Sequence, residues 1–85
     1  MPEQEMDIAY VIGKRIKAGR EKCDLSQEEL ASKCVPALSV VYLSEIERGK
    51  KNITVIRLRS VAIALNVSMD YLTAMPNTEQ SSDND

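Results

Sequence analysis

The residue types that usually carry enzyme chemistry are scarce in this chain of 85 residues. It has no histidine, and its only cysteines are Cys23 and Cys34. The absence of histidine removes the usual nitrogen ligands of zinc and any His-assisted nucleophile. The remaining Ser, Cys and carboxylate side chains show no recognisable pairing of a base with a nucleophile. We therefore expect no enzyme activity, no metal and no cofactor. Spacing alone permits a disulfide between the cysteines, but reduced thiols in a cytoplasm are the simpler expectation.

Residue types suited to reading DNA bases are grouped on one short segment, VVYLSEIER. Val40 and Val41 could touch thymine methyl groups, Ser44 could bond several base edges, and Glu45 could accept from a cytosine amino group. Solvent alone does not favour two adjacent valines at the exposed start of a short helix. The alternative is that one valine packs under a neighbouring loop and that Glu45 only adds solubility.

Groups that could hold DNA phosphates lie on both sides of this segment. After it comes a donor-rich loop suited to phosphate contacts, consisting of Arg48, Gly49, Lys50, Lys51 and Asn52. Before it, Ser26 marks a helix start whose free amides and positive dipole end can hold a phosphate, with Gln27 placed to assist. Binding through such contacts should weaken steeply as salt rises, because phosphate contacts release counterions.

The elements that must position these groups are predicted from helix starts. A small polar cap, with a large apolar residue just before it and another four positions after it, is typical of a helix N-terminus. Five residues meet this test: Asp7, Ser26, Ser39, Thr54 and Ser68. They predict helices over about 8–22, 27–34, 40–48, 55–65 and 69–74, and no strand pattern competes. At Ser26 a capping box with Glu29 is also expected, and Gly49 and Asn66 are suited to helix ends.

Helical periodicity then selects the residues that should form the core. They are Ile8, Val11, Ile12, Ile16, Leu30, Ala31, Cys34, Leu43, Ile46, Leu58, Val61, Ala62 and Leu65. With Leu43 and Ile46 facing inward, helical spacing places the two valines, Ser44, Glu45 and Arg48 on the outer side.

Charge divides the chain into three parts. The net charge is −2, but residues 1–7 and 76–85 hold acidic residues and no Lys or Arg. Residues 8–75 keep all eleven basic residues against seven acidic ones and so carry +4. We expect an acidic N-terminal extension over 1–7, one folded domain over 8–75, and a disordered acidic tail over 76–85. No apolar run is long enough to span a membrane, and nothing resembles a signal peptide.

Three segments together resemble a known family. IGKRIKAGREKCDLSQEELASK, YLSEIERGKKN and LRSVAIALNVSMDYL are similar to the phage-repressor and Cro-like helix-turn-helix transcriptional regulators. The resemblance covers roughly residues 12–72 and implies an all-α, five-helix, lambda-repressor-like fold. It also implies a homodimer on double-stranded operator DNA, with the second and third helices as the helix-turn-helix pair and the third in the major groove.

The resemblance also implies roles for particular residues. Arg20 and Glu47 are expected to form a buried ion pair, and Gln27 is expected to touch the phosphate backbone. The base-reading positions fall on Ser39, Val40, Val41, Ser44 and Glu45. We add Tyr42, on the same segment, to the expected DNA-binding residues.

One part of the chain departs from the family pattern. The connector CVPALSVV is two residues longer than the family's usual turn and lacks its glycine. Pro36 disfavours a helical conformation at Val35, so the second helix should end near Cys34 and residues 35–38 should form a looser turn. The third helix is expected to begin after Ser39. The alternative start, near Pro36, would bring Ala37 towards the DNA.

The predicted function is that of a transcriptional regulator which binds a near-palindromic operator as a homodimer. The dimer surface is expected on the fifth helix and the end of the fourth, at Val67, Met69, Tyr71, Leu72 and Met75. In the alternative, Val67 and Leu72 complete the core of one subunit. A second function stays open, in which the face around Val40, Val41 and Tyr42 binds another protein, as in an antitoxin.

Overall fold

The structure is a computed structural model that describes residues 7–74. These residues form five α-helices. They are α1 (Ile8–Lys22), α2 (Gln27–Lys33), α3 (Val40–Glu47), α4 (Val55–Leu65) and α5 (Met69–Thr73). No strand occurs within these residues, so the predicted all-α class is confirmed. The helices match the predicted ranges to within one residue at each end. Most of the acidic extension, the whole 76–85 tail and Met75 lie outside the described residues.

Each helix begins at its predicted polar cap. The capping oxygens of Asp7, Ser26, Ser39, Thr54 and Ser68 each accept a hydrogen bond from a backbone amide in the first turn of their helix. At α2 the predicted capping box is complete, because the Glu29 carboxylate also accepts from the Ser26 amide at 2.7 Å. Local sequence therefore determines where every helix starts.

Left-handed residues close three of the helices. Asp24, Gly49 and Asn66 have φ values of 60°, 74° and 58°. At the end of α3 the Gly49 amide donates to the Ile46 carbonyl at 3.0 Å, and the Lys50 amide donates to the Glu45 carbonyl at 2.9 Å. This pair of bonds is a Schellman motif, in which glycine is the residue that adopts positive φ without strain. The roles of Gly49 and Asn66 were predicted, whereas that of Asp24 was not.

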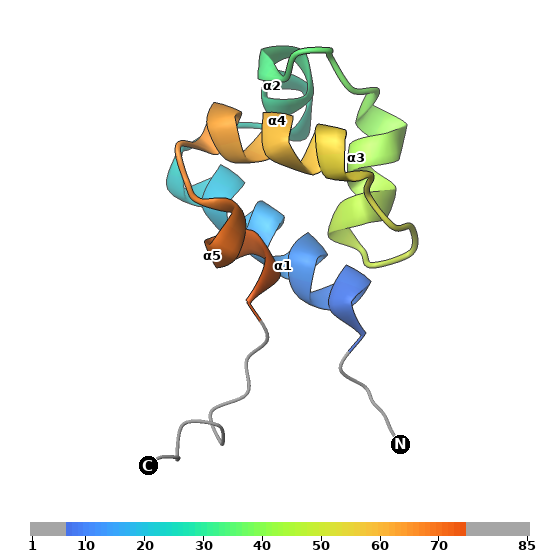
Figure 1. Ribbon diagram of the computed structural model, residues 1–85. Helices are drawn as coiled ribbons and strands as arrows, with labels where there is room; N and C mark the ends of the chain where they lie inside the picture. Colours follow the sequence, from blue (N-terminus) through green and yellow to red (C-terminus); the bar gives the residue numbers. More distant parts are fainter. Residues whose placement is uncertain (1–6, 75–85) are drawn as a thin grey trace.

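The helices enclose one core. α1 packs against α3, α4 and α5, and α2 packs against α3 and α4. In Figure 1, α4 crosses the molecule between α2 and α5, while the start of α1 and the end of α5 lie at the end opposite α2. The predicted core residues are buried with one exception. Ile8 is 41% exposed, because it lies in the first turn of α1, beyond the core cluster that starts at Ile12.

The long connector between α2 and α3 is held to α2 at its C-terminal end and is exposed at its middle. The Leu38 amide donates to the Ala31 carbonyl at 3.0 Å, and the Leu38 side chain is buried. Val35 is 83% exposed, and the Val35–Pro36 peptide bond is cis. The predicted end of α2 near Cys34 and the predicted start of α3 after Ser39 are both confirmed.

The two cysteines are free thiols in different surroundings, and this difference can be tested. Cys23 is exposed, whereas Cys34 is buried. Burial raises the pKa of the Cys34 thiol, against a smaller opposing effect of its hydrogen bond with Ser60. At pH 8 a smaller fraction of Cys34 is thiolate than in an ordinary cysteine, because its pKa is raised. Its burial also keeps a thiol reagent such as N-ethylmaleimide away from the sulfur. Mass spectrometry after N-ethylmaleimide treatment should show Cys23 alkylated and Cys34 reacting at least about tenfold more slowly. Equal rates in the folded protein would contradict the placement of Cys34.

Candidate nucleic-acid interface

The predicted reading face is on the outside of α3. Leu43 and Ile46 are fully buried and hold the opposite side of the helix in the core. Val41 is 69% exposed, Val40 is also exposed, and Ser44 and Glu45 are partly exposed. The described subunit leaves the two valines exposed and covers Ser44 and Glu45 only in part, so α3 can present all four side chains to a partner.

One ion pair joins the reading face to the loop that follows it. The Lys51 ammonium lies 3.0 Å from a Glu45 carboxylate oxygen, and both side chains are partly solvated. A pair this exposed adds little stability, about 0.2 to 1 kcal/mol. The Glu45 carboxylate is thus weakly held and can exchange Lys51 for another donor.

Tyr42 has a different environment from its neighbours on α3. Its side chain is partly buried against the core, and its hydroxyl is shielded without a hydrogen-bond partner. The Lys51 ammonium and the Arg57 guanidinium lie 5.9 Å and 5.1 Å from the centre of its ring. The predicted contact of Tyr42 with DNA would have to be made by the ring and not by the hydroxyl.

The predicted phosphate-binding groups are at the surface on both sides of α3. In the loop after α3, Arg48, Lys50, Lys51 and Asn52 are all exposed. At the start of α2, Ser26 is exposed and its oxygen accepts from the Glu29 amide. Gln27 is partly buried, and its side-chain nitrogen donates to Glu47 at 3.0 Å. Because an amide nitrogen carries two donors, Gln27 keeps one for a phosphate.

The implied ion pair between Arg20 and Glu47 is confirmed. Arg20 Nε and Nη2 donate to the two Glu47 carboxylate oxygens at 2.7 Å and 3.0 Å, and Arg20 Nη1 donates to the Leu25 carbonyl at 2.8 Å. The two side chains are only 12% and 3% exposed. The hydrogen bond to Glu47 raises the pKa of Arg20, against the opposing effect of burial. With Gln27 bound to the same carboxylate, the network links α1, α2 and α3.

A close approach of two backbones sets the position of α3, and it was not among the features predicted from the sequence. A Cβ atom on Gly13 would overlap the Ile46 carbonyl oxygen and lie 2.9 Å from the Glu47 carbonyl oxygen. A Cβ on Gly49 would lie 3.0 Å from the Tyr10 Cα. The available signal was a glycine inside a strongly helical pattern, which usually has a packing reason.

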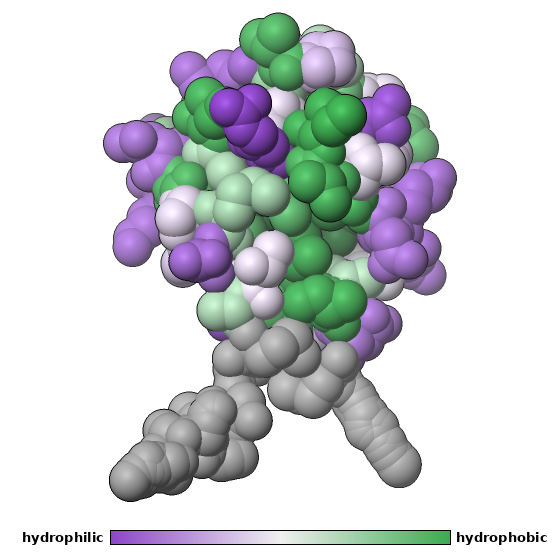
Figure 2. All heavy atoms as spheres, viewed as in Figure 1, coloured by the Kyte–Doolittle hydropathy of each residue, from purple (hydrophilic) through white to green (hydrophobic). Residues whose placement is uncertain are grey.

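The predicted dimer surface is only partly at the surface of the subunit. Leu72 is 0% exposed, so its assignment to the interface is corrected: its side chain fills the subunit's own core. Val67 and Met69 are partly buried against that core, and Tyr71 is exposed. Ile63, near the end of α4, is 64% exposed and was not predicted. Figure 2 shows apolar side chains among hydrophilic ones on the face over α4.

Other kinds of site find no support in the described residues. Within residues 7–74, no three His, Cys, Asp or Glu side chains gather into a group that could hold a metal ion. In the same part of the chain, no helix has both the length and the apolar character needed to cross a membrane.

Comparison with known proteins decides the family. A family model described as helix-turn-helix (HTH_3) matches residues 16–72. This chain belongs to that helix-turn-helix family. The family is one of DNA-binding helix-turn-helix transcriptional regulators.

Relatives of this helix-turn-helix protein support the same fold and class. The control protein C.MunI of a Mycoplasma species is 36% identical over 67 residues, which are 78% of this chain and 88% of C.MunI. The crystal structure of the restriction-modification controller C.AhdI from Aeromonas hydrophila has a TM-score of 0.70 and 30% identity, covering 75% of this chain and 94% of C.AhdI. The P22 c2 repressor, solved with a synthetic operator, has a TM-score of 0.69 and 31% identity over 75% of this chain and 94% of that one. The lambda-repressor-like fold is therefore confirmed.

Proposed function

We propose that this protein is a non-enzymatic transcriptional regulator that binds a near-palindromic DNA operator as a homodimer. The observation that carries the proposal is the outward face of α3, where Val40 and Val41 are exposed and are followed along the chain by the exposed cations Arg48, Lys50 and Lys51. The buried Leu43 and Ile46 hold this face outward. The repressor with a similar fold that was solved with operator DNA gives further support.

The dimer is proposed on the face formed by the end of α4 and α5. Ile63 and Tyr71 are exposed large side chains there, and Val67 and Met69 are partly exposed. A hollow of about 390 Å³, lined by Gly19, Lys22, Cys23, Leu65, Val67, Ser68 and Tyr71, opens beside α5. It could receive a side chain of a second subunit. Two-fold symmetry would then match two half-sites about 34 Å apart, one turn of DNA.

The relatives suggest which promoter to test first. C.MunI is named a control protein, and C.AhdI is described as a restriction-modification controller. We infer that this chain controls restriction-modification genes, as the name of C.AhdI describes. DNA upstream of its own gene and of neighbouring genes is therefore the first candidate operator.

Selection of bound fragments from a random DNA pool tests the proposal. We expect an enriched site with two related half-sites, and sedimentation of the complex should give two subunits per site. Enrichment of no sequence would contradict sequence-specific binding. An enriched site bound by one subunit would contradict the homodimer. If the folded protein does not bind DNA but binds a partner protein with an affinity that salt does not change, the alternative protein-interaction role is indicated.

Removing two loop charges should weaken binding to every DNA sequence alike. The Lys50→Gln/Lys51→Gln variant lacks two exposed ammonium groups, so its log–log salt slope should become less steep by up to about 0.9 for each phosphate that is no longer neutralised. Fluorescence anisotropy over a series of salt concentrations measures this slope. Lys33→Gln, a change at an exposed lysine of α2 outside the predicted set, is the control. Unchanged affinity in the double variant would count against the loop as a phosphate grip.

Changes on the reading face should instead alter sequence preference. Val41→Ala and Glu45→Gln each remove a group that could contact a base edge, and one such contact discriminates by about 1 to 3 kcal/mol. Fragment selection repeated with each variant should show a changed base at one position of each half-site, while affinity for unrelated DNA stays within about twofold. Equal losses on selected and unrelated DNA would contradict the base-reading role.

A further inference from the structure

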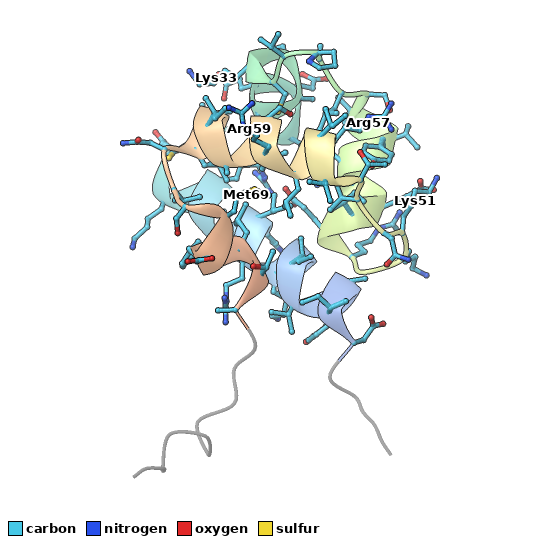
Figure 3. All side chains as sticks on the ribbon, viewed as in Figure 1. Lys33, Lys51, Arg57, Arg59 and Met69 are labelled. Atoms are coloured by element: carbon cyan, nitrogen blue, oxygen red, sulfur yellow. The ribbon has the colours of Figure 1, made fainter. Side chains whose placement is uncertain are left out.

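Arg57 lies beside the start of the reading helix, although it belongs to α4. It is the third residue of α4, and Figure 3 shows it at the end of that helix nearest α3. Its guanidinium carbon is 5.1 Å from the centre of the Tyr42 ring. Such a cation–π contact fixes the plane of the guanidinium and lowers the entropy lost when it binds a ligand.

The charge of Arg57 is not balanced within the described residues. Its side chain has no ion pair with any carboxylate in residues 7–74, whereas Arg20 is paired with Glu47 and Lys51 with Glu45. Lys51 also approaches the Tyr42 ring, at 5.9 Å. Because Lys51 is already paired with Glu45, the unbalanced charge beside this ring is that of Arg57, and an anion placed near it would be favoured.

An open hollow gives an anion access to Arg57. The hollow is lined by Arg57 of α4, by Tyr42 of α3 and by the last residues before α3, which are Ala37, Leu38 and Ser39. Its volume is about 260 Å³. Ser39, which lines the hollow, directly precedes the exposed Val40 and Val41 in the chain.

We propose that Arg57, held against Tyr42, binds a DNA phosphodiester on the strand that passes the start of α3. This inference rests on the proposed function and adds a third phosphate grip, supplied by α4. Arginine suits this role because its fork of donors matches two phosphate oxygens at once. A phosphate contact carries no sequence information, so Arg57 would fix the register of α3 on the duplex and leave base choice to α3 itself.

The test compares two single-charge changes in one helix. Arg57→Gln should weaken binding to the selected operator by about tenfold and reduce the salt slope by about 0.9 for each subunit. Arg59→Gln is the matched control, because Arg59 is also an exposed arginine of α4 but lies in the middle of that helix, away from the hollow. It should change affinity by less than about twofold. Equal effects of the two variants would overturn the inference while leaving the proposed function intact.

Ethylation interference on the operator locates the contact. With the parent protein, ethylation of a specific phosphate in each half-site should inhibit binding, and with Arg57→Gln that one signal should disappear. An unchanged pattern would overturn the inference. If the parent protein binds no DNA, the inference and the proposed function both fail.

Changes at Tyr42 separate positioning from folding. Tyr42→Phe keeps the ring on which Arg57 rests and removes only the unpartnered hydroxyl, so it is the reference with which Tyr42→Leu is compared. Tyr42→Leu removes the surface on which Arg57 rests and should weaken binding by about threefold. In Arg57→Gln, Tyr42→Leu should have no further effect on binding, since the side chain it positions is gone. Additive losses would contradict a positioning role, and thermal midpoints would show whether Tyr42→Leu remains folded.

Discussion

A Gly13→Ala protein is expected to be less stable than the parent by about 1 to 3 kcal/mol, the typical range for overpacking a well-packed contact. In most helix interiors the same change stabilises by about 0.5 to 1 kcal/mol, because glycine is a poor helix former. The sign reverses here because the new methyl group would meet the Ile46 and Glu47 carbonyl oxygens, which are rigid backbone atoms. α1 and α3 would have to separate.

Gly19→Ala in the same helix is the matched control. Its Cβ would lie 3.2 Å from a Leu65 methyl group, and the flexible end of a leucine side chain can move aside. The result should be near neutral, within about 1 kcal/mol in either direction. Urea denaturation followed by circular dichroism gives both values. Equal effects at the two glycines would contradict the close packing of α1 on α3.

Glu47→Ala is expected to cost about 3 to 5 kcal/mol, because it leaves the Arg20 guanidinium buried without its partner. The Gln27 side chain loses its acceptor as well. A loss of this size is a large fraction of the roughly 5 to 15 kcal/mol that typically stabilises a folded domain. The urea midpoint should fall steeply, and DNA binding should fall with it, since the network joins α2 and α3 to α1.

A double-mutant cycle distinguishes the ion pair from the packing of its members. Arg20→Met/Glu47→Leu removes both charges and keeps apolar volume, so it should recover much of the stability lost in Glu47→Ala. If the double variant loses as much free energy of unfolding as Arg20→Met and Glu47→Leu lose together, the two side chains act independently. That result would contradict a network in which the two charges depend on each other.

The sequence predicted the helices well because their start signals are local. Ser26 and Ser39 cap their own helices, and this pattern needs no knowledge of the rest of the fold. The outward placement of Val41 also followed from periodicity, because Leu43 and Ile46 could only face the core. The Arg20–Glu47 pair came from the family resemblance, since two residues 27 apart give no local signal.

Features that depend on packing between distant segments were missed. The approach of Gly13 to Ile46 depends on how α1 crosses α3, which periodicity does not specify. Leu72 was placed at the dimer surface because a terminal helix looked too apolar for its length, yet α1 and α4 cover it and it completes the core. The position of Arg57 against Tyr42 arises only where α4 meets α3, so Arg57 was absent from the predicted DNA-binding residues.

The anchored exit of the connector has a consequence for how such proteins can diverge. Because the Leu38 amide is hydrogen-bonded to Ala31 of α2 while Val35 projects into solvent, we expect extra residues between them to enlarge the bend outward and to change the entry angle of α3 little. We therefore expect insertions in this bend to be tolerated, whereas a change that breaks the Leu38–Ala31 hydrogen bond should let α3 reorient relative to α2.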